Sequence, residues 1–312
     1  MVVAAGLAVL VSEAAVPALS EQKRGRVEGF DVGVLRRDGV VVPFAAYDGR
    51  GWDRIWSLPA LELTVPISIG GIPRRWWGPT PPLENWELTT SAGTRAAHVV
   101  QPDWVQAHCA RQIGLKTDYR AGEPSPPQSA QPYPKDGLAV SPPHPVERVE
   151  IVAPAAPELR ALMPTLLKSF NESERQVESR SGHPVVRRSR EGVEPTIEAA
   201  YAVGSNPRAY YIEATRAYRE IGHTADDCAA IGFGTGWFVR EGEAFRALTM
   251  ALDLLNCRRE TASYMLPLGV MRLDDRLYWL AQFSGWDHER YVVLEIKSKR
   301  VEVLVNVWGG SC

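Results

Sequence analysis

The residue types that most readily do chemistry form only short clusters in this 312-residue chain. Asp287, His288 and Glu289 are adjacent, and a histidine between two carboxylates can titrate near neutral pH or share a cation with them. Adjacent residues on a strand point to opposite faces, however, so the three side chains do not converge automatically. Our preferred interpretation is that the cluster is a polar hairpin turn. The alternative is that Asp287, His288 and Glu289 are catalytic residues.

A second cluster contains His223, Asp226, Asp227 and Cys228. His223 and Asp227 could share one helical turn as metal ligands, and Cys228 could act as a nucleophile beside His223. The neighbouring Gly222 and the flanking extended runs favour a surface loop, and a disulfide at Cys228 would remove the thiol. The sequence also lacks a phosphate-binding glycine loop, a nucleophile elbow, a zinc-protease helix and an EF-hand loop. We predict no metal site and no cofactor, and we favour a non-enzymatic protein.

Five of the ten tryptophans are concentrated in one part of the chain, among glycines and prolines. They are Trp52, Trp56, Trp76, Trp77 and Trp86. Flat indoles held by rigid loops can stack on sugar rings or bind apolar side chains of a partner. The structural alternative is that they pack over the ends of the sheets. These residues are the binding candidates that the sequence offers.

The four cysteines permit three pairings and form no CxxC motif, which argues against a zinc ribbon or a thioredoxin-type site. Cys228 and Cys257 flank a predicted hairpin and are the preferred disulfide. Cys312 could hold the C-terminus against Cys109. The alternative is that all four are buried free thiols.

Residues 1–18 resemble a signal peptide. Val2–Val11 is an uncharged apolar run too short to span a bilayer, and the small residues that follow suit cleavage before Leu19. No lysine or arginine precedes the run, so the basic start of such a peptide would lie upstream of Met1. The alternative is a first strand or a buried helix. We expect a secreted or periplasmic protein without a transmembrane segment, whose oligomeric state the sequence leaves open.

The charge balance argues against nucleic-acid partners. The chain carries 35 basic and 37 acidic residues, for a net charge of -2. Binding to duplex DNA or RNA needs a concentrated basic face, which this composition does not supply.

Most recognisable elements are short extended runs. Gly33–Tyr47 predicts a hairpin with a two-residue turn at Asp38-Gly39. Four runs at 269–273, 276–283, 290–296 and 301–308 predict an antiparallel meander. Further strands are expected at 61–69, 86–90, 209–219, 231–240 and 244–252. Residues 103–113 predict a short helix, and 176–195 a polar loop.

One segment, residues 157–175, has the apolar spacing of an amphipathic helix, which Pro164 should kink or divide. It follows a proline-rich stretch, 122–146, that predicts a linker or a surface loop. We therefore expect a β-rich region at 19–121, the linker, and a region at 147–312 that combines the helix with a β-meander.

The segment Gly33–Asp38 also aligns with Gly269–Asp274, which indicates one hairpin unit used twice. The predicted fold is mainly β, with antiparallel hairpins in a propeller-like or two-sandwich arrangement.

The predicted function is that of an exported protein that binds a glycan or another protein, or builds an envelope structure. The alternative is a secreted hydrolase acting on an extracellular polymer through carboxylate or histidine catalysis.

Overall fold

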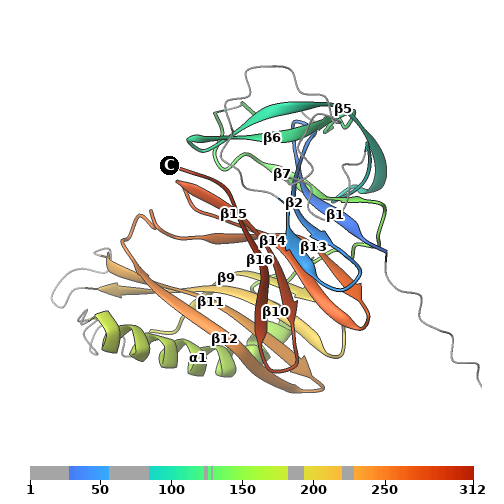
Figure 1. The fold of residues 1–312 in the computed structure, drawn as a ribbon. Helices are drawn as coiled ribbons and strands as arrows, with labels where there is room; N and C mark the ends of the chain where they lie inside the picture. The colour runs from blue at the N-terminus through green and yellow to red at the C-terminus, as the bar shows by residue number, and fades with distance from the viewer. Residues whose placement is uncertain (1–27, 56–83, 123–125, 128, 182–192, 220–227) are drawn as a thin grey trace, which may run out of the picture.

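The computed structural model describes residues 28–55, 84–122, 126–127, 129–181, 193–219 and 228–312. Over these residues the chain is mainly β, its strands are antiparallel, and it has one helix, which confirms the predicted fold class. The elements form four layers, in the order barrel, central sheet, helix-backed sheet and helix (Figure 1). The propeller-like alternative is not supported, because the strands pack as a closed barrel and two facing sheets.

Six strands close the barrel, in the order β1-β7-β4-β5-β6-β2, and β2 returns to pair with β1. The barrel strands are β1 (Phe30–Arg36), β2 (Val40–Tyr47), β4 (Asn85–Thr90), β5 (Gly93–Ala107), β6 (Ala110–Thr117) and β7 (Lys135–Ser141), and β3 (Trp52–Arg54) pairs with β2 outside the ring. Closure removes the free edges that an open sheet would present.

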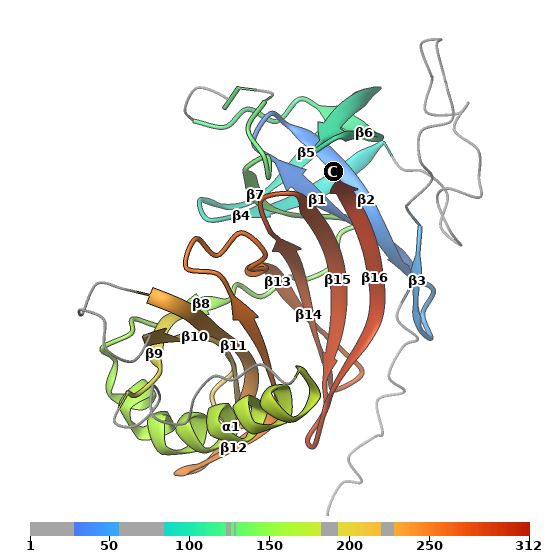
Figure 2. The ribbon, with the colours of Figure 1, turned by 90° about the vertical axis from the view of Figure 1, so that its left-hand side faces the viewer.

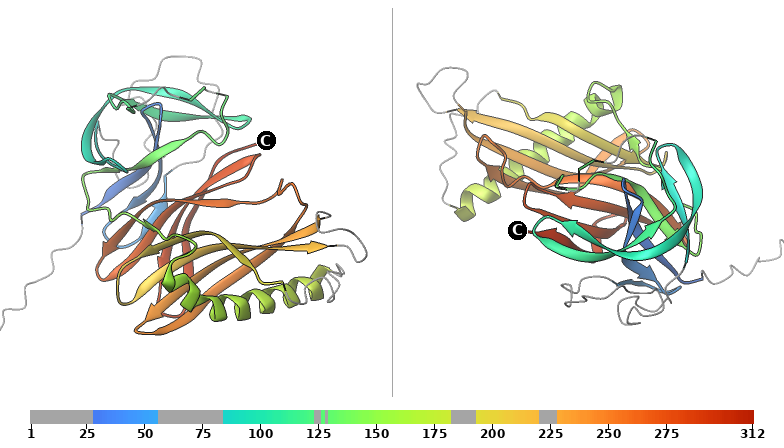
Figure 3. Two further views of the ribbon diagram at one scale, coloured as in Figure 1. Left: turned by 180° about the vertical axis from the view of Figure 1, so that it is seen from behind. Right: turned by 90° about the horizontal axis from the view of Figure 1, so that it is seen from above.

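The other strands form two open sheets. The central sheet is the predicted meander, with β13 (Tyr264–Leu273), β14 (Arg276–Ser284), β15 (His288–Ile296) and β16 (Val301–Ser311) in sequence order. The helix-backed sheet contains β8 (Glu150–Ile151), β9 (Thr196–Val203), β10 (Arg208–Arg219), β11 (Cys228–Glu241) and β12 (Ala244–Leu255), again in sequence order. Figures 2 and 3 show the central sheet between the barrel and the helix-backed sheet.

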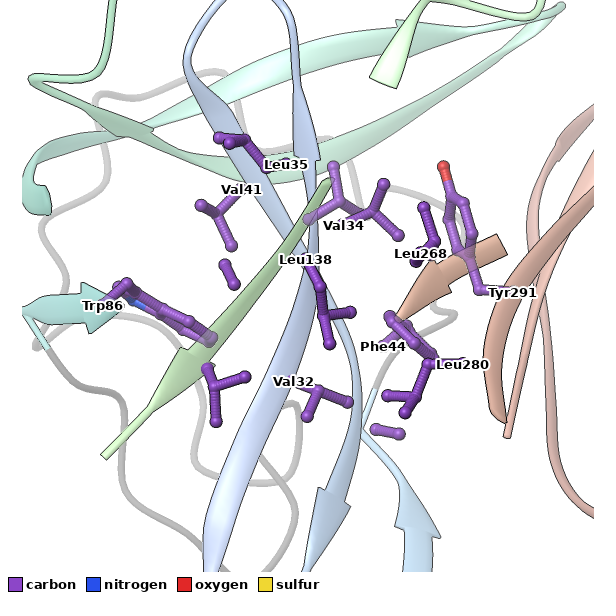
Figure 4. Packing of buried hydrophobic residues seen from close by; sticks show 14 of the residues in the cluster. Val32, Val34, Leu35, Val41, Phe44, Trp86, Leu138, Leu268, Leu280 and Tyr291 are labelled. Carbon is purple, nitrogen blue, oxygen red and sulfur yellow. The ribbon is translucent and has the colours of Figure 1, made fainter. Parts of the chain in front are cut away.

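Each pair of neighbouring layers shares a hydrophobic core. The hairpin β1–β2 is buried along its whole length because one face lines the barrel and the other packs on the central sheet. Figure 4 shows Phe44, Leu280 and Tyr291 gathered on that second face, and the rings of Phe44 and Tyr291 lie 5.5 Å apart. On the far side of the central sheet, Trp279 meets Trp237 of the helix-backed sheet at 4.9 Å. The central sheet is thus covered on both faces.

The helix α1 (Pro157–Ser181) packs on the outer face of the helix-backed sheet. Its buried side is made by apolar residues at helical spacing, namely Leu159, Leu162, Leu166 and Phe170. Pro164 lies inside the helix without dividing it, on the exposed side, where water can satisfy the carbonyl that its missing N–H leaves free. The helix continues beyond residue 175, so the loop predicted from residue 176 is wrong up to Ser181.

Residues 103–113 form strands and not the predicted helix. They run through the end of β5, the turn at His108 and Cys109, and the start of β6. Trp104 pairs with Ile113 across this hairpin, and His108 adopts a φ of 54° in the turn. The pairing that completes the barrel outweighs the local helical pattern. The proline-rich segment also contributes to the barrel, because β7 lies between β1 and β4.

The two aligned segments are the hairpins β1–β2 and β13–β14. The first has a three-residue turn, Arg37–Gly39, with Gly39 at a φ of 82°, and not the predicted two-residue turn. The second has the two-residue turn, with Asp274 at 48° and Asp275 at 64°, as a type I′ turn requires. The hairpins lie in different sheets and pack against each other in the shared core.

Two disulfides join distant parts of the chain. Cys228 is bonded to Cys257, the pairing preferred from the sequence, and Cys109 is bonded to Cys312. None of the four cysteines is free. Among the described residues, α1 is neither apolar nor uncharged enough to cross a membrane.

Candidate binding surface

The tryptophans proposed from the sequence do not form one surface. Trp86 is buried in the barrel core, where it points inward from β4 (Figure 4), and it is 1% exposed. Trp52 packs against the rings of Phe30, Tyr47 and Tyr278 at 5.4 to 5.6 Å. A ligand could reach Trp86 only by opening the barrel. Trp56, Trp76 and Trp77 lie outside the described residues.

Two other tryptophans are exposed at one end of the central sheet. Trp286, in the turn between β14 and β15, is 66% exposed, and Trp308, on β16, is 61% exposed. Trp308 lies beside His288, with the two rings 6.0 Å apart. Trp286 lies two residues before His288 in the turn, which is closed by the bond from the Gly285 N–H to the His288 carbonyl at 3.0 Å. Large exposed apolar side chains are candidates for an interaction surface where they gather in one patch.

The imidazole of His288 is held by its neighbour in the chain. His288 Nδ1 lies 2.6 Å from Asp287 Oδ1, and this hydrogen bond lowers the pKa of the Asp287 carboxyl. The pair is partly exposed, and its imidazole lies beside the Trp308 indole. It therefore offers an acceptor and a donor next to a flat apolar face.

A cation completes the surface. In the register of the central sheet, Arg290 is paired with Phe283 on one side and with Trp308 on the other. Its guanidinium lies 5.1 Å above the Phe283 ring. Within the described residues Arg290 has no carboxylate partner. We name Trp286, His288, Arg290 and Trp308 the Trp286–Trp308 platform.

The platform is attached to the barrel by the C-terminus. The Cys312 N–H donates to the carbonyl of Asp287 at 2.8 Å, and Cys312 is bonded to Cys109 in the turn between β5 and β6. Gly310 lies so close to Ala107 that a Cβ at this position would be 2.3 Å from the Ala107 carbonyl oxygen. Figure 1 shows the C-terminus beside this hairpin. The turn Gly285–His288 is thus closed by its own hydrogen bond and also bonded to the C-terminus, and such a turn can keep its side chains preorganised for a ligand.

Glu289, the third member of the cluster predicted from the sequence, faces away from the platform. Its side chain points into the contact between barrel and central sheet, where it accepts hydrogen bonds from Lys135 at 3.1 Å and from the Tyr291 hydroxyl. His108 Nε2 lies 3.9 Å from the same carboxylate. Burial lowers the pKa of both Lys135 and His108. This buried group joins two layers, and the alternation of strand residues places Glu289 on the face opposite to that of His288.

The remaining catalytic candidates from the sequence do not form a site among the described residues. His223 and Asp227 lie outside the described residues, and Cys228 is in a disulfide and carries no nucleophilic thiol. The described part of the chain contains no group of three or more histidine, cysteine or acidic residues placed to hold a metal ion.

Sequence reasoning missed both exposed tryptophans. Trp286 lies in the break at Ser284–Asp287, between the predicted strands 276–283 and 290–296, and an aromatic residue in such a turn is the signal available. Trp308 alternates with buried Val305 and Val307, which identifies its face but not whether another sheet covers it.

No protein-family model, curated protein or solved structure matches this chain.

Proposed function

We propose that the chain is an exported, non-enzymatic binding protein that holds a glycan on the Trp286–Trp308 platform. The observation that carries the proposal is the presence of two exposed indoles at the disulfide-linked end of the central sheet, one of them 6.0 Å from the His288 imidazole. The two disulfides support export, because such bonds persist in oxidising compartments.

The chemistry of the platform suits a sugar ring. A pyranose has apolar C–H faces, which an indole can cover, and a rim of hydroxyl groups, which need donors and acceptors. Asp287 and His288 supply both kinds of polar group. Arg290 adds a positive charge that has no carboxylate partner among the described residues, so a glycan with acidic groups fits best. A protein partner would need about 800 Å² on this side, which two indoles and three polar residues do not supply.

The test is affinity electrophoresis of the full chain through gels containing polygalacturonate or the neutral hydroxyethylcellulose. We expect polygalacturonate to retard the protein. Trp308→Ala should weaken retention about 30-fold in Kd, since truncating a central tryptophan costs about 2 kcal/mol. Trp286→Ala should act in the same direction, and Arg290→Gln should weaken retention by polygalacturonate.

The control is Val100→Ala, which removes an equally exposed apolar side chain from β5 of the barrel. It should leave retention unchanged. Absence of retardation in both gels, or equal retardation of wild type and Trp308→Ala, would reject the proposal. Unfolding curves for each variant separate lost binding from lost structure.

The hydrolase alternative has less support. Hydrolysis by acid–base catalysis needs two carboxylates, or a histidine and a carboxylate, converging in a cleft. The cleft formed by β4, β7, β8, β9 and β13 is lined by one carboxylate, Asp136, which accepts a hydrogen bond from the Tyr119 hydroxyl at 2.8 Å. We therefore place binding first.

A further inference from the structure

A cleft lies where three of the layers meet, away from the Trp286–Trp308 platform. Its walls are the end of β4 with the turn that follows and the start of β7 from the barrel, the edge strand β13 of the central sheet, and β8 and β9 of the helix-backed sheet. The cavity has a volume of about 340 Å³. This is the lower end of the range of small-molecule sites, which are common at the junctions of structural units.

One wall of the cleft is apolar and exposed. Ile151 of β8 is 79% exposed and Leu266 of β13 is 39% exposed, although large apolar side chains are normally covered in a folded chain. Tyr201 of β9, which is paired with Ile151 in the register of the helix-backed sheet, also lines the cleft and is half-buried. These side chains belong to two different sheets, so they line one cleft only because the layers meet here.

The opposite side of the cleft carries a positive charge without a partner. Arg148 lines the cleft, and its Nη2 would be 3.9 Å from a Cβ placed on Gly93 of the β4–β5 turn. Within the described residues its guanidinium makes no hydrogen bond or ion pair. The carboxylates beside it in the chain are already paired, Glu147 with Arg272 and Glu150 with Arg208, both at 2.7 Å.

The other charged residues of the lining are also neutralised. Asp136 accepts from the Tyr119 hydroxyl and lies 3.7 Å from Arg37, and the ammonium of Lys135 is buried against Glu289. The unbalanced charge of the cleft is therefore the single positive charge of Arg148.

An extended peptide is a poor occupant, because β13 has few free backbone groups on its outer edge. The Met265 N–H donates to Glu213, Pro267 has no N–H, and Val270 is paired in both directions with Glu147. Strand addition needs such groups in a row. The Ser91 hydroxyl also lines the cleft, whereas the Thr90 hydroxyl already donates to the Gly93 carbonyl at 3.1 Å and accepts the Ala92 N–H at 3.2 Å.

We propose that this cleft binds a small amphipathic carboxylate. Its aliphatic chain lies over Ile151, Tyr201 and Leu266, and its carboxylate pairs with the Arg148 guanidinium. The site is separate from the glycan platform, and each can be tested without the other.

The test uses the full chain and the fluorescent amphiphile 11-(dansylamino)undecanoic acid, displaced by dodecanoic acid, 1-dodecanol or acetate. We expect dansyl fluorescence to increase on binding, and dodecanoate to displace the probe. Dodecanol should bind about tenfold more weakly, because a charge-assisted hydrogen bond to an arginine is worth roughly that factor. Acetate should not compete, since it lacks the apolar chain.

Variants separate the two halves of the site. Arg148→Gln should weaken dodecanoate about tenfold and leave dodecanol unchanged, and Ile151→Asp should weaken both. Arg160→Gln, on the exposed side of α1, is the matched control and should change neither. No fluorescence increase with wild type, equal displacement by dodecanol and dodecanoate, or equal affinity in Arg148→Gln and Arg160→Gln would each overturn the proposal. Retention on polygalacturonate should be the same in all three variants.

Discussion

The buried carboxyl of Glu213 gives a prediction about pH and stability. Glu213 lies on β10, is 3% exposed, and faces the central sheet, where its Oε1 accepts the Met265 N–H at 2.7 Å. Burial, with a smaller contribution from the nearby charge of Glu198, raises the pKa of Glu213 from 4.5 to about 7, although the Met265 N–H and the Tyr211 hydroxyl act in the opposite direction. The folded chain therefore keeps this carboxyl protonated over a range in which the unfolded chain ionises it.

The raised pKa fixes the sign and the window of the effect. Below pH 4.5 the carboxyl is protonated in both states, and its full contribution to stability is present. Between pH 4.5 and about 7 only the unfolded state loses the proton, so the free energy of unfolding falls as pH rises. Above about pH 7 the loss is complete, at about 3 kcal/mol, from 1.36 kcal/mol for each pKa unit.

Glu213→Gln tests this reasoning. The amide oxygen can still accept the Met265 N–H, but the side chain cannot ionise, so the variant should be more stable than wild type by about 3 kcal/mol at pH 8 and nearly equal to it at pH 4.5. Urea unfolding followed by tryptophan fluorescence across this range measures the difference. Glu243→Gln, in the exposed turn between β11 and β12, is the control and should stay within about 0.5 kcal/mol of wild type at every pH. A difference between Glu213→Gln and wild type that does not change with pH would refute the burial argument.

Two further predictions concern stability. Replacing both Cys109 and Cys312 with serine should lower the free energy of unfolding by about 5 kcal/mol, and replacing Cys228 and Cys257 should lower it by about 3.5 kcal/mol. The first loss is larger because that disulfide spans 203 residues and the second spans 29. Urea unfolding measures both losses, and the opposite order would contradict the loop-closure account. Trp86→Ala should cost about 3 to 5 kcal/mol, because it empties a buried site in the barrel core, and a thermal unfolding midpoint near that of wild type would show that the barrel is not packed as described.

The elements predicted correctly are those with local signals. The positions of the hairpins depend on a few residues that tolerate positive φ, such as Gly39 and Asp274-Asp275, although the turn at Gly39 has three residues and not the predicted two. The helix was visible because Leu159, Leu162 and Leu166 repeat at 3.6-residue spacing over several turns. Both signals are contained in one stretch of sequence, so distant contacts are not needed to read them.

The elements that were mispredicted depend on distant partners. Residues 103–113 become strands because pairing of β5 with β6 completes a ring that begins at residue 30. The strand β7 was hidden among prolines, although Lys135–Ser141 is the proline-free stretch between Pro134 and Pro142 and keeps every N–H that a ladder needs. The sequence shows such stretches, but it does not show whether the other strands of a barrel are placed to pair with them.

The candidate sites were missed for a related reason, which also explains where they lie. A residue such as Trp308 follows the same alternating pattern as the core residues of its strand, and only the extent of the neighbouring layer decides whether it is covered. The central sheet is buried on both faces where the barrel and the helix-backed sheet overlap it, and its end beyond them carries the platform. The cleft at Arg148 likewise lies at the edge of the contact between the barrel, the central sheet and the helix-backed sheet. Both proposed sites of this chain lie at the margins of its layers, and those margins are set by packing between segments far apart in the sequence.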